Sequence, residues 1–201
     1  MPIGEAKRRL RREMQARRRA VGPAERAAAG DGVADHVLRS PEFGAALRVA
    51  LYAALPDEIP TDRLLRAVLA SGRVLLLPRM RIDGALEFAA VTDLGGLRGG
   101  RFGTLEPPAS EPPSRLAPGD LVLAPGVAFD RRGGRLGRGL GAYDRSLPTG
   151  ARAPRCFGLA FAFQLVPVVP EQGHDRRVDA VATEVELVRA GPTRDLAADP
   201  G

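Results

Sequence analysis

The sequence contains no tryptophan, one cysteine and two histidines in 201 residues, and only 4% of its residues are aromatic. A single cysteine, Cys156, cannot form an internal disulfide, which is compatible with a reducing compartment. Because Cys156 lies in the apolar run 155–163, we expect a packed thiol and not a nucleophile. The scarcity of histidine and cysteine also excludes a dense cluster of soft metal ligands.

Long hydrophobic stretches are missing as well. No segment approaches the roughly 18 apolar residues that a membrane span needs, and no apolar core follows the N-terminal charges as it does in a secretory signal. We therefore expect a cytoplasmic protein without membrane association. With 44% hydrophobic and 27% charged residues, the chain suits one compact domain over residues 1–190, followed by a flexible tail at 191–201.

The positive charge of the chain is concentrated near its N-terminus. The whole sequence has 30 basic and 24 acidic residues and a net charge of +6. Residues 7–19 alone hold eight basic residues and one acidic residue, a net +7, so everything outside them sums to −1. One predicted helix therefore supplies the basicity, and the body of the protein is close to neutral.

Three interpretations of this basic helix compete. It can be a solvated amphipathic helix whose Leu10 and Met14, at i and i+4, contact the body. Its charge also fits a nucleic-acid-binding arm, although few aromatic residues accompany the arginines. A third interpretation, which depends on the family resemblance described below, places Lys7 and Arg11 against ATP and leaves the remaining arginines at the surface.

Hydrophobic patterning and turn residues predict alternating helices and strands. The expected elements are helix 5–20, helix 23–39, strand 49–55, helix 62–70, strand 74–77, strand 86–91, strand 120–124 and strand 157–162. Five prolines between 106 and 118 predict an extended surface loop. These elements favour a single-domain, three-layer α/β/α fold with a mostly parallel sheet and N-terminal helices, in which ligands bind beyond the carboxyl ends of the strands.

Residues 121–145 combine an apolar strand, a glycine-rich basic loop and the start of a helix. Five glycines between 133 and 141 allow positive φ values, and three arginines place cations among the loop amides. Helical residues resume at Ala142, so Asp144 would lie beside an anion bound at the N–H groups of that helix. From spacing alone, a phosphate site and an ordinary mobile loop are equally supported.

Four blocks of sequence, in order along the chain, carry a family resemblance. They are KRRLR at 7–11, the stretch 52–61, Phe129-Asp130 with RLGRGLGAYDR at 135–145, and the C-terminal stretch 164–184. Together they resemble the 5-formyltetrahydrofolate cyclo-ligase family, also called 5,10-methenyltetrahydrofolate synthetase. The resemblance implies an ATP- and magnesium-dependent enzyme that phosphorylates the formyl oxygen of 5-formyltetrahydrofolate. Attack by N10 then yields 5,10-methenyltetrahydrofolate, with ADP and phosphate released.

The resemblance also implies roles for individual residues. Arg138 and Tyr143 are the implied catalytic residues, and Asp144 and Asp175 the implied magnesium ligands. The expected folate-side residues are Ala53, Glu58, Phe102 and Tyr143. The implied ATP contacts are Lys7, Arg11, Arg135, Leu136, Gly137, Arg138, Gly139, Leu140, Gly141, Ala142 and Tyr143. For Phe102, an apolar wall for the folate and simple core packing are equally supported.

One position departs from the family pattern. The family commonly ends its glycine loop with Gly-Tyr-Tyr-Asp, whereas this chain has Ala142 in place of the first tyrosine. A ring that could stack on folate or nucleotide is therefore absent, while Tyr143 and Asp144 are kept.

Two other functions stay open at the level of sequence. One is an ATP-dependent ligase or kinase that acts on a non-folate acid, and the other is a non-catalytic, basic nucleic-acid-associated protein with the same fold. The preferred hypothesis names ATP and 5-formyltetrahydrofolate as partners, with Mg²⁺ as cofactor and no nucleic acid. Without an obvious apolar patch, we expect a monomer.

Overall fold

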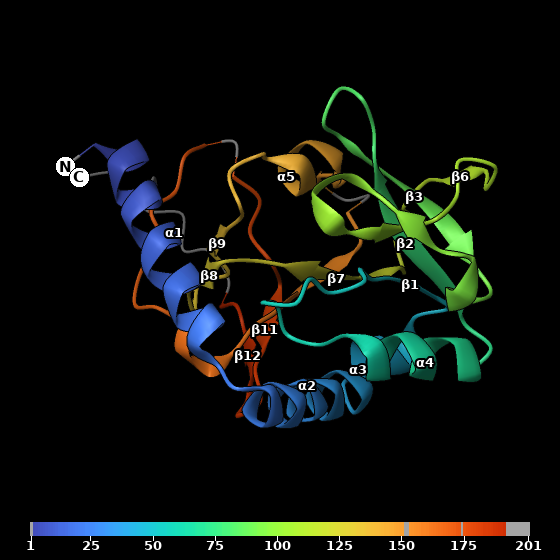
Figure 1. Cartoon of the computed structure of the whole chain (residues 1–201), viewed down its shortest axis with the longest axis horizontal. Helices are drawn as coiled ribbons and strands as arrows, with labels where there is room; N and C mark the ends of the chain where they lie inside the picture. The colour runs from blue at the N-terminus through green and yellow to red at the C-terminus, as the bar shows by residue number, and fades with distance from the viewer. Residues whose placement is uncertain (1, 151–152, 174, 192–201) are drawn as a thin grey trace, which may run out of the picture.

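The structure is a computed structural model that describes residues 2–150, 153–173 and 175–191. Its centre is an eight-stranded sheet with the order β12-β11-β10-β7-β1-β2-β3-β6 (Figure 1). The strands are β1 (Arg48–Ala50), β2 (Val74–Met80), β3 (Leu86–Val91), β6 (Pro113–Ser114), β7 (Leu121–Pro125), β10 (Arg155–Leu159), β11 (Ala180–Ala182) and β12 (Leu187–Arg189). Five adjacent strands, β11, β10, β7, β1 and β2, are parallel, and antiparallel strands lie at both edges.

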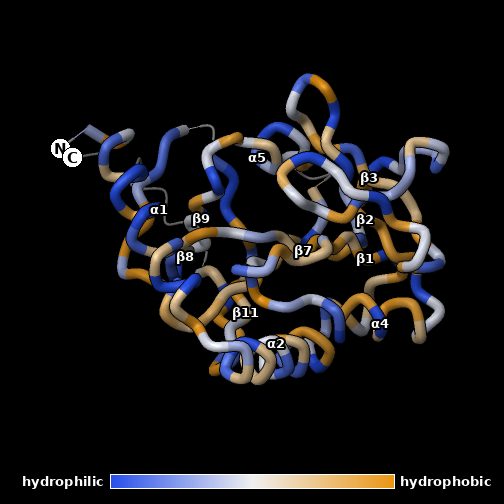
Figure 2. Tube along the Cα trace, in the orientation of Figure 1, coloured by the Kyte–Doolittle hydropathy of each residue, from blue (hydrophilic) through white to orange (hydrophobic). Residues whose placement is uncertain are grey.

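Helices lie on both faces of this sheet, as the sequence predicts. Helices α2 (Pro23–Leu38), α3 (Pro41–Ala45) and α4 (Asp62–Ala70) cover one face, and the short α5 (Ala142–Ser146) lies over the other (Figure 1). Helix α1 (Ile3–Ala20) crosses the end of the sheet near β8 and carries long hydrophilic stretches (Figure 2). None of the described helices is long and apolar enough to cross a membrane.

The alternation of side chains along β7 shows why the sheet is covered twice. Leu121 and Leu123 pack into the core beneath α2 and α4, whereas Val122 and Ala124 pack into the core on the α5 side. All four side chains are almost completely buried. A parallel strand that is buried on both faces is apolar along its whole length. This is the pattern that made the strand recognisable in the sequence.

Most predicted elements are confirmed, but the strand predicted at 49–55 is too long. Strand β1 ends at Ala50, and the chain then leaves the sheet. The hydroxyl of Thr61 donates to the carbonyl of Tyr52 and accepts from the N–H of Ala54. A side chain therefore satisfies backbone groups that a longer strand would have paired with its neighbours. The strand predicted at 157–162 is likewise shifted, because β10 ends at Leu159 and η4 (Ala162–Gln164) follows.

Two small hairpins were not predicted. Strands β4 (Arg98–Gly99) and β5 (Leu105–Glu106) flank η2 (Arg101–Gly103), which follows η1 (Leu94–Gly96), and strands β8 (Ala128–Phe129) and β9 (Arg135–Leu136) flank the first part of the glycine loop. The loop predicted at 106–118 is extended as expected, although β6 within it pairs with β3. Of the tail predicted to be flexible at 191–201, only Gly191 lies within the described residues.

Candidate functional site

A pocket of about 410 Å³ lies at the carboxyl ends of β1, β2 and β7. Tyr52 and Ala53 follow β1, Met80 ends β2, Pro125 ends β7 and Gly126 comes next; all five line the pocket. In open α/β sheets this edge is the one at which ligands bind. The sequence therefore places the site at the correct end of the sheet.

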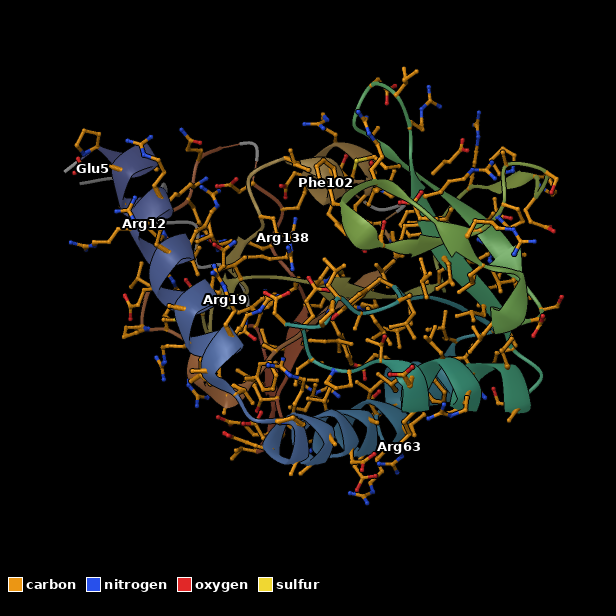
Figure 3. The ribbon with its side chains drawn as sticks, in the orientation of Figure 1. Glu5, Arg12, Arg19, Arg63, Phe102 and Arg138 are labelled. Carbon is orange, nitrogen blue, oxygen red and sulfur yellow. The ribbon has the colours of Figure 1, made fainter. Side chains whose placement is uncertain are left out.

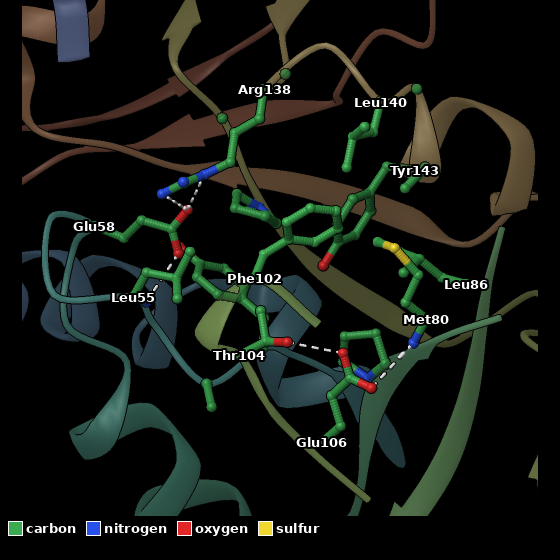
Figure 4. Close-up of a pocket in the computed structure, with 18 of the residues that line it drawn as sticks. Leu55, Glu58, Met80, Leu86, Phe102, Thr104, Glu106, Arg138, Leu140 and Tyr143 are labelled. Carbon is green, nitrogen blue, oxygen red and sulfur yellow. Dashed lines mark hydrogen bonds and ion pairs between the residues drawn. The ribbon is translucent and has the colours of Figure 1, made fainter. Parts of the chain in front are cut away.

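Three further parts of the chain contribute to the walls. Helix α1 contributes Gln15, and the β4–β5 hairpin contributes Phe102, Thr104, Leu105 and Glu106. The glycine loop and α5 contribute Arg135, Gly137, Arg138, Leu140, Gly141, Ala142, Tyr143 and Asp144. In Figure 4, Glu58 and Arg138 lie on one side and Met80, Leu86 and Glu106 on the other, with Phe102 and Tyr143 between them.

The four expected folate-side residues, Ala53, Glu58, Phe102 and Tyr143, all line this pocket. Phe102 is not a core residue, because 63% of it is exposed. Its φ of 61° lies in the left-handed region, which bulky residues seldom adopt. The β4–β5 hairpin thus holds an exposed aromatic ring at the pocket in a strained backbone conformation, which core packing does not explain.

The turn after β1 presents Glu58 to the pocket from a nearly buried position, with 7% of the residue exposed. Oε2 of Glu58 accepts a hydrogen bond from the N–H of Leu55 at 3.0 Å, which closes the turn. Oε1 accepts from Nε of Arg138 at 3.2 Å and lies 3.7 Å from a terminal nitrogen of Arg18. A carboxylate held in this way is pre-oriented toward a ligand in the pocket.

Arg18 was predicted to lie at the surface with the other arginines of the basic helix, and this prediction is wrong. It is 1% exposed, and its Nε donates to the carbonyl oxygen of Asp57 at 2.7 Å. Residues 7, 11, 14 and 18 lie within a narrow arc of an α-helix, so Lys7, Arg11, Met14 and Arg18 share the face that packs on the body. Because the neighbouring residues are also arginines, the residue types alone do not show which arginine is buried and which are exposed.

Asp57 lies between two arginines. Its Oδ2 is 2.8 Å from Arg18 and its Oδ1 is 2.8 Å from Arg138. Burial raises the pKa of Asp57, but the positive charges of Arg18 and Arg138 outweigh burial and hold the pKa below its usual value. Asp57 is therefore a charged partner of both arginines.

A buried aspartate shapes the start of the glycine loop. Asp130 is 0% exposed; its Oδ1 accepts from the N–H groups of Arg132 and Gly134, and its Oδ2 from that of Val169. Burial raises the pKa of Asp130, but the hydrogen bonds from these N–H groups, led by that of Val169, outweigh burial and hold the pKa below its usual value. Asp130 is thus an ionised support for the loop, with no contact to the pocket.

Past this support, Arg135, Tyr143 and Asp144 form one group on the pocket wall. A terminal nitrogen of Arg135 is 2.5 Å from Oδ1 of Asp144, and its guanidinium lies 5.5 Å from the centre of the Tyr143 ring. Nε of Arg135 is buried without a hydrogen-bond partner among the described residues. Burial, with a contribution from the charge of Glu58, raises the pKa of Tyr143, so its phenol stays neutral and can donate a hydrogen bond.

Comparison with known proteins assigns the chain to a family. The model of the 5-formyltetrahydrofolate cyclo-ligase family matches residues 3–184. The chain belongs to this family. It is 31% identical to the 5-formyltetrahydrofolate cyclo-ligase of Escherichia coli over 174 residues, which are 83% of this chain and 94% of that protein. It is 27% identical to the mouse 5-formyltetrahydrofolate cyclo-ligase over 193 residues, which are 90% of this chain and 95% of that protein.

Solved structures agree with this assignment. The structure of the 5,10-methenyltetrahydrofolate synthetase of Aquifex aeolicus superposes with a TM-score of 0.80 at 31% identity, covering 94% of this chain and 95% of that one. The synthetase of Mycoplasma pneumoniae, at 20% identity and a TM-score of 0.71, covers 89% of this chain and 98% of that one and shares the fold. Membership of this cyclo-ligase family favours an enzyme over a non-catalytic nucleic-acid-associated protein.

Two residues that the cyclo-ligase resemblance assigns to ATP lie on the body-facing side of α1. Nζ of Lys7 is 2.5 Å from Oδ2 of Asp175, and Nε of Arg11 donates to the carbonyl of Gly137 at 2.8 Å. The helix therefore contacts both the glycine loop and the C-terminal block. Met14 packs against the body of the protein, as predicted. Figure 3 shows Arg138 between α1 and the hairpin that carries Phe102.

Part of the predicted ATP-contacting loop borders a second cavity of about 500 Å³. Its lining residues are Gly139, Leu140, Gly141, Asp144, Arg145, Gly173 and Arg176. Asp144 and two residues of the loop, Leu140 and Gly141, line both cavities, so the two spaces adjoin at the glycine loop. Leu136 differs from its neighbours, because it is almost fully buried and packs in the core beneath α1.

The two aspartates predicted to bind magnesium, Asp144 and Asp175, lie on neighbouring segments. Asp144 accepts a hydrogen bond through Oδ1 from the N–H of Arg176, the residue after Asp175. Within the described residues, no cluster of three or more His, Cys, Asp or Glu side chains is placed to hold a metal ion. Magnesium binds readily through one or two carboxylates together with phosphate oxygens and water, so this donor set fits it only beside a nucleotide.

Cys156 is a buried thiol, as predicted, and its pKa is raised to about 12 by burial. It belongs to the core on the α5 side of the sheet and lines neither cavity.

Proposed function

We propose that this protein catalyses the ATP- and magnesium-dependent conversion of 5-formyltetrahydrofolate to 5,10-methenyltetrahydrofolate, with ADP and phosphate as the other products. The observation that supports it best is a predominantly apolar pocket with Glu58 on one wall and the arginine-bearing glycine loop on another. A flat heterocycle needs the wall that carries Glu58, and a phosphoryl donor needs the arginine-bearing loop. The adjoining second cavity leaves room for a nucleotide beside the folate.

The reaction needs an activated formyl oxygen, because oxide or hydroxide is a poor leaving group. Transfer of the γ-phosphoryl group from ATP converts that oxygen into part of a phosphate ester. The N10 amine attacks the formyl carbon and gives up its proton, the carbon–oxygen bond breaks, and phosphate leaves with that oxygen and can take up the proton. No protein nucleophile takes part, so catalysis rests on positioning and on stabilisation of the charge on the transferring phosphoryl group.

The folate side of the site uses Glu58, Phe102 and Tyr143. The Glu58 carboxylate accepts hydrogen bonds from N–H donors of the pterin ring, a role for which its buried and anchored position suits it. Phe102 and Tyr143 offer aromatic surface to the flat ring system. The neutral Tyr143 phenol donates a hydrogen bond toward the reacting oxygen.

The phosphate side uses the glycine loop and α1. Arg135 and Arg138 on the loop, with Lys7 and Arg11 from the helix, supply the positive charge that a triphosphate requires. The loop also offers backbone N–H groups near the start of α5. Asp144 and Asp175 would hold magnesium, which supplies charge neutralisation on the phosphate oxygens when bound. As ligands, these two aspartates would exchange their present contacts with Arg135 and Lys7 for the ion.

The near-ultraviolet absorbance rise of 5,10-methenyltetrahydrofolate tests this proposal directly. Purified protein, 5-formyltetrahydrofolate, magnesium and ATP should give a rise that the omission of ATP or the substitution Asp144→Ala abolishes. Glu58→Ala should damage folate use and spare nucleotide binding, whereas Glu186→Ala, an exposed carboxylate paired with Arg131, serves as the matched control. Unchanged turnover in Glu58→Ala would remove the central residue of the folate assignment. Turnover of another acid in place of the folate would favour the alternative ligase or kinase.

A further inference from the structure

Two arginines contact the same pair of carboxylates, but they differ in burial and in the element that carries them. The Arg18 side chain comes from α1 and is 1% exposed, whereas the Arg138 side chain comes from the glycine loop and is 40% exposed. Both guanidinium groups reach Asp57 at 2.8 Å, and both approach Oε1 of Glu58, at 3.7 Å and 3.2 Å respectively. One cation is therefore enclosed by the fold, while the other is partly exposed on the loop.

Arg18 is tied to the backbone of this turn as well as to its side chains. Its Nε donates to the carbonyl of Asp57 at 2.7 Å, and another nitrogen donates to the carbonyl of Gly126 after β7 at 3.4 Å. Arg26 in α2 completes the contact by donating to the carbonyls of both Arg18 and Glu58. The guanidinium of Arg18 therefore links the turn after β1 to the segment that follows β7.

Arg138 cannot contact the carboxylates of Asp57 and Glu58 and the phosphate oxygens of a nucleotide from the same position. If it turns toward phosphate oxygens in the glycine loop, its contacts to Asp57 and Glu58 are lost. Both carboxylates are then left with Arg18 as the nearest cation shown in the structure. An unpaired carboxylate in a largely buried place is costly, so the fixed cation keeps the turn in its folate-binding geometry after Arg138 moves.

We propose that Arg18 is the positioning residue of the folate site: it acts through Asp57 and the backbone of the turn to hold Glu58 in place while Arg138 changes partners. This assignment rests on the proposed function, because Glu58 is the residue that meets the folate ring. Arg18 itself lines neither cavity and touches no reacting atom.

The test is the substitution Arg18→Lys. Lysine keeps the positive charge but lacks the planar guanidinium, whose several N–H donors contact the backbone and the two carboxylates at once. Loss of a hydrogen bond between charged groups predicts that the Kd and KM for 5-formyltetrahydrofolate rise about tenfold. The KM for ATP and the Kd of a non-hydrolysable ATP analogue should stay within about twofold, since the glycine loop is untouched. Arg17→Lys is the matched control, because Arg17 is one position away and packs on Phe163, outside the site.

Thermal unfolding of each variant separates positioning from stability. Asp57→Asn is a second variant that needs no change in the buried helix face; it should also raise the folate Kd, and combining it with Arg18→Lys should add less than the sum of the two. A parallel loss of folate and nucleotide affinity would show a merely structural role, and an unchanged folate Kd would also overturn the proposal. Wild-type protein that binds no 5-formyltetrahydrofolate would instead overturn the proposed function, and with it any folate role for Arg18.

Discussion

Nε of Arg138 donates to Oε1 of Glu58 at 3.2 Å, which joins the glycine loop directly to the turn after β1 (Figure 4). The two residues are 80 positions apart in sequence and belong to the phosphate side and the folate side of the proposed site. In this structure Arg138 occupies the carboxylate that the folate would use, and Glu58 occupies the guanidinium that the phosphate groups of ATP would use. Bound folate would therefore release Arg138 for ATP, and bound ATP would release Glu58 for the folate. Protein with one ligand bound should bind the second ligand more tightly than free protein does.

Arg138→Ala should separate these two roles. Loss of the cation near the transferring phosphoryl group should lower kcat about 100-fold. Folate binding without nucleotide should not weaken, because Glu58 loses a competing partner and keeps Arg18. Calorimetric titration with 5-formyltetrahydrofolate and steady-state rates measure the two effects. Arg131→Ala, an exposed arginine between β8 and β9 that pairs with Glu186, should change neither. Equal losses in folate affinity and in kcat would contradict the exchange.

Tyr143→Phe tests whether the phenol works as a neutral hydrogen-bond donor. Because burial raises the pKa of Tyr143 above its usual value of 10, the hydroxyl stays protonated through the neutral and mildly alkaline range. The phenylalanine variant should keep folate affinity and lose about tenfold in kcat, the effect of one hydrogen bond to a developing charge. The pH–rate profiles of the two proteins should have the same shape between pH 6 and pH 9. An alkaline limb that the wild type shows and the variant lacks would instead show that Tyr143 loses its proton within this range.

Much of the fold could be predicted because its elements have strong local signals. The amphipathic α4 and the uninterrupted apolar β7 are visible in short windows of sequence, and the predicted bounds of α4 agree with the structure. Strand β1 is shorter than predicted because Thr61, nine residues after Tyr52, takes over the backbone hydrogen bonds. Strands of two residues, such as β8 and β9, have no periodicity to detect.

The site divides in the same way. Residues in the glycine loop and at Glu58 could be predicted because they lie in blocks that resemble a family. Glu58 and most of the loop residues line one pocket, whereas Gly139 lines only the second cavity and Leu136 is buried in the core. The burial of Arg18 could not be predicted by counting charges, because its neighbours in the arginine run are identical in type. Helical spacing from Met14 was the available signal, since i and i+4 share one face. Tyr52 was also missed, because it looked like part of a buried strand.

Asp130→Asn should destabilise the protein at neutral pH. An asparagine keeps one acceptor oxygen but places an amide N–H₂ against either the N–H of Val169 or those of Arg132 and Gly134. The loss of charge-assisted bonds at a buried site should cost about 2–3 kcal/mol of the free energy of unfolding.

The pH dependence of this effect follows from the lowered pKa of Asp130. A depressed pKa contributes stability that is fully present above the usual value of 3.8 and is lost as pH falls through the native-state pKa. The difference between wild type and variant should therefore be constant near pH 7 and shrink below about pH 4. Urea unfolding at several pH values measures it, with Asp31→Asn, an exposed aspartate of α2, as control. A difference that grows on acidification would refute the assignment.

Ala142→Tyr tests the one departure from the family's loop pattern. Ala142 is the first residue of α5 and lines the pocket beside Tyr143, so a ring here can reach a flat ligand without a change in the backbone. An added aromatic contact of about 1 kcal/mol predicts a KM for 5-formyltetrahydrofolate about fivefold lower. Ala142→Leu is the matched control, because it adds apolar volume without a π face. If both variants lower KM equally, burial of apolar surface and not stacking is responsible. If tyrosine raises KM while leucine does not, the ring competes with the substrate for the 410 Å³ of the pocket, and alanine is the residue that keeps this space open.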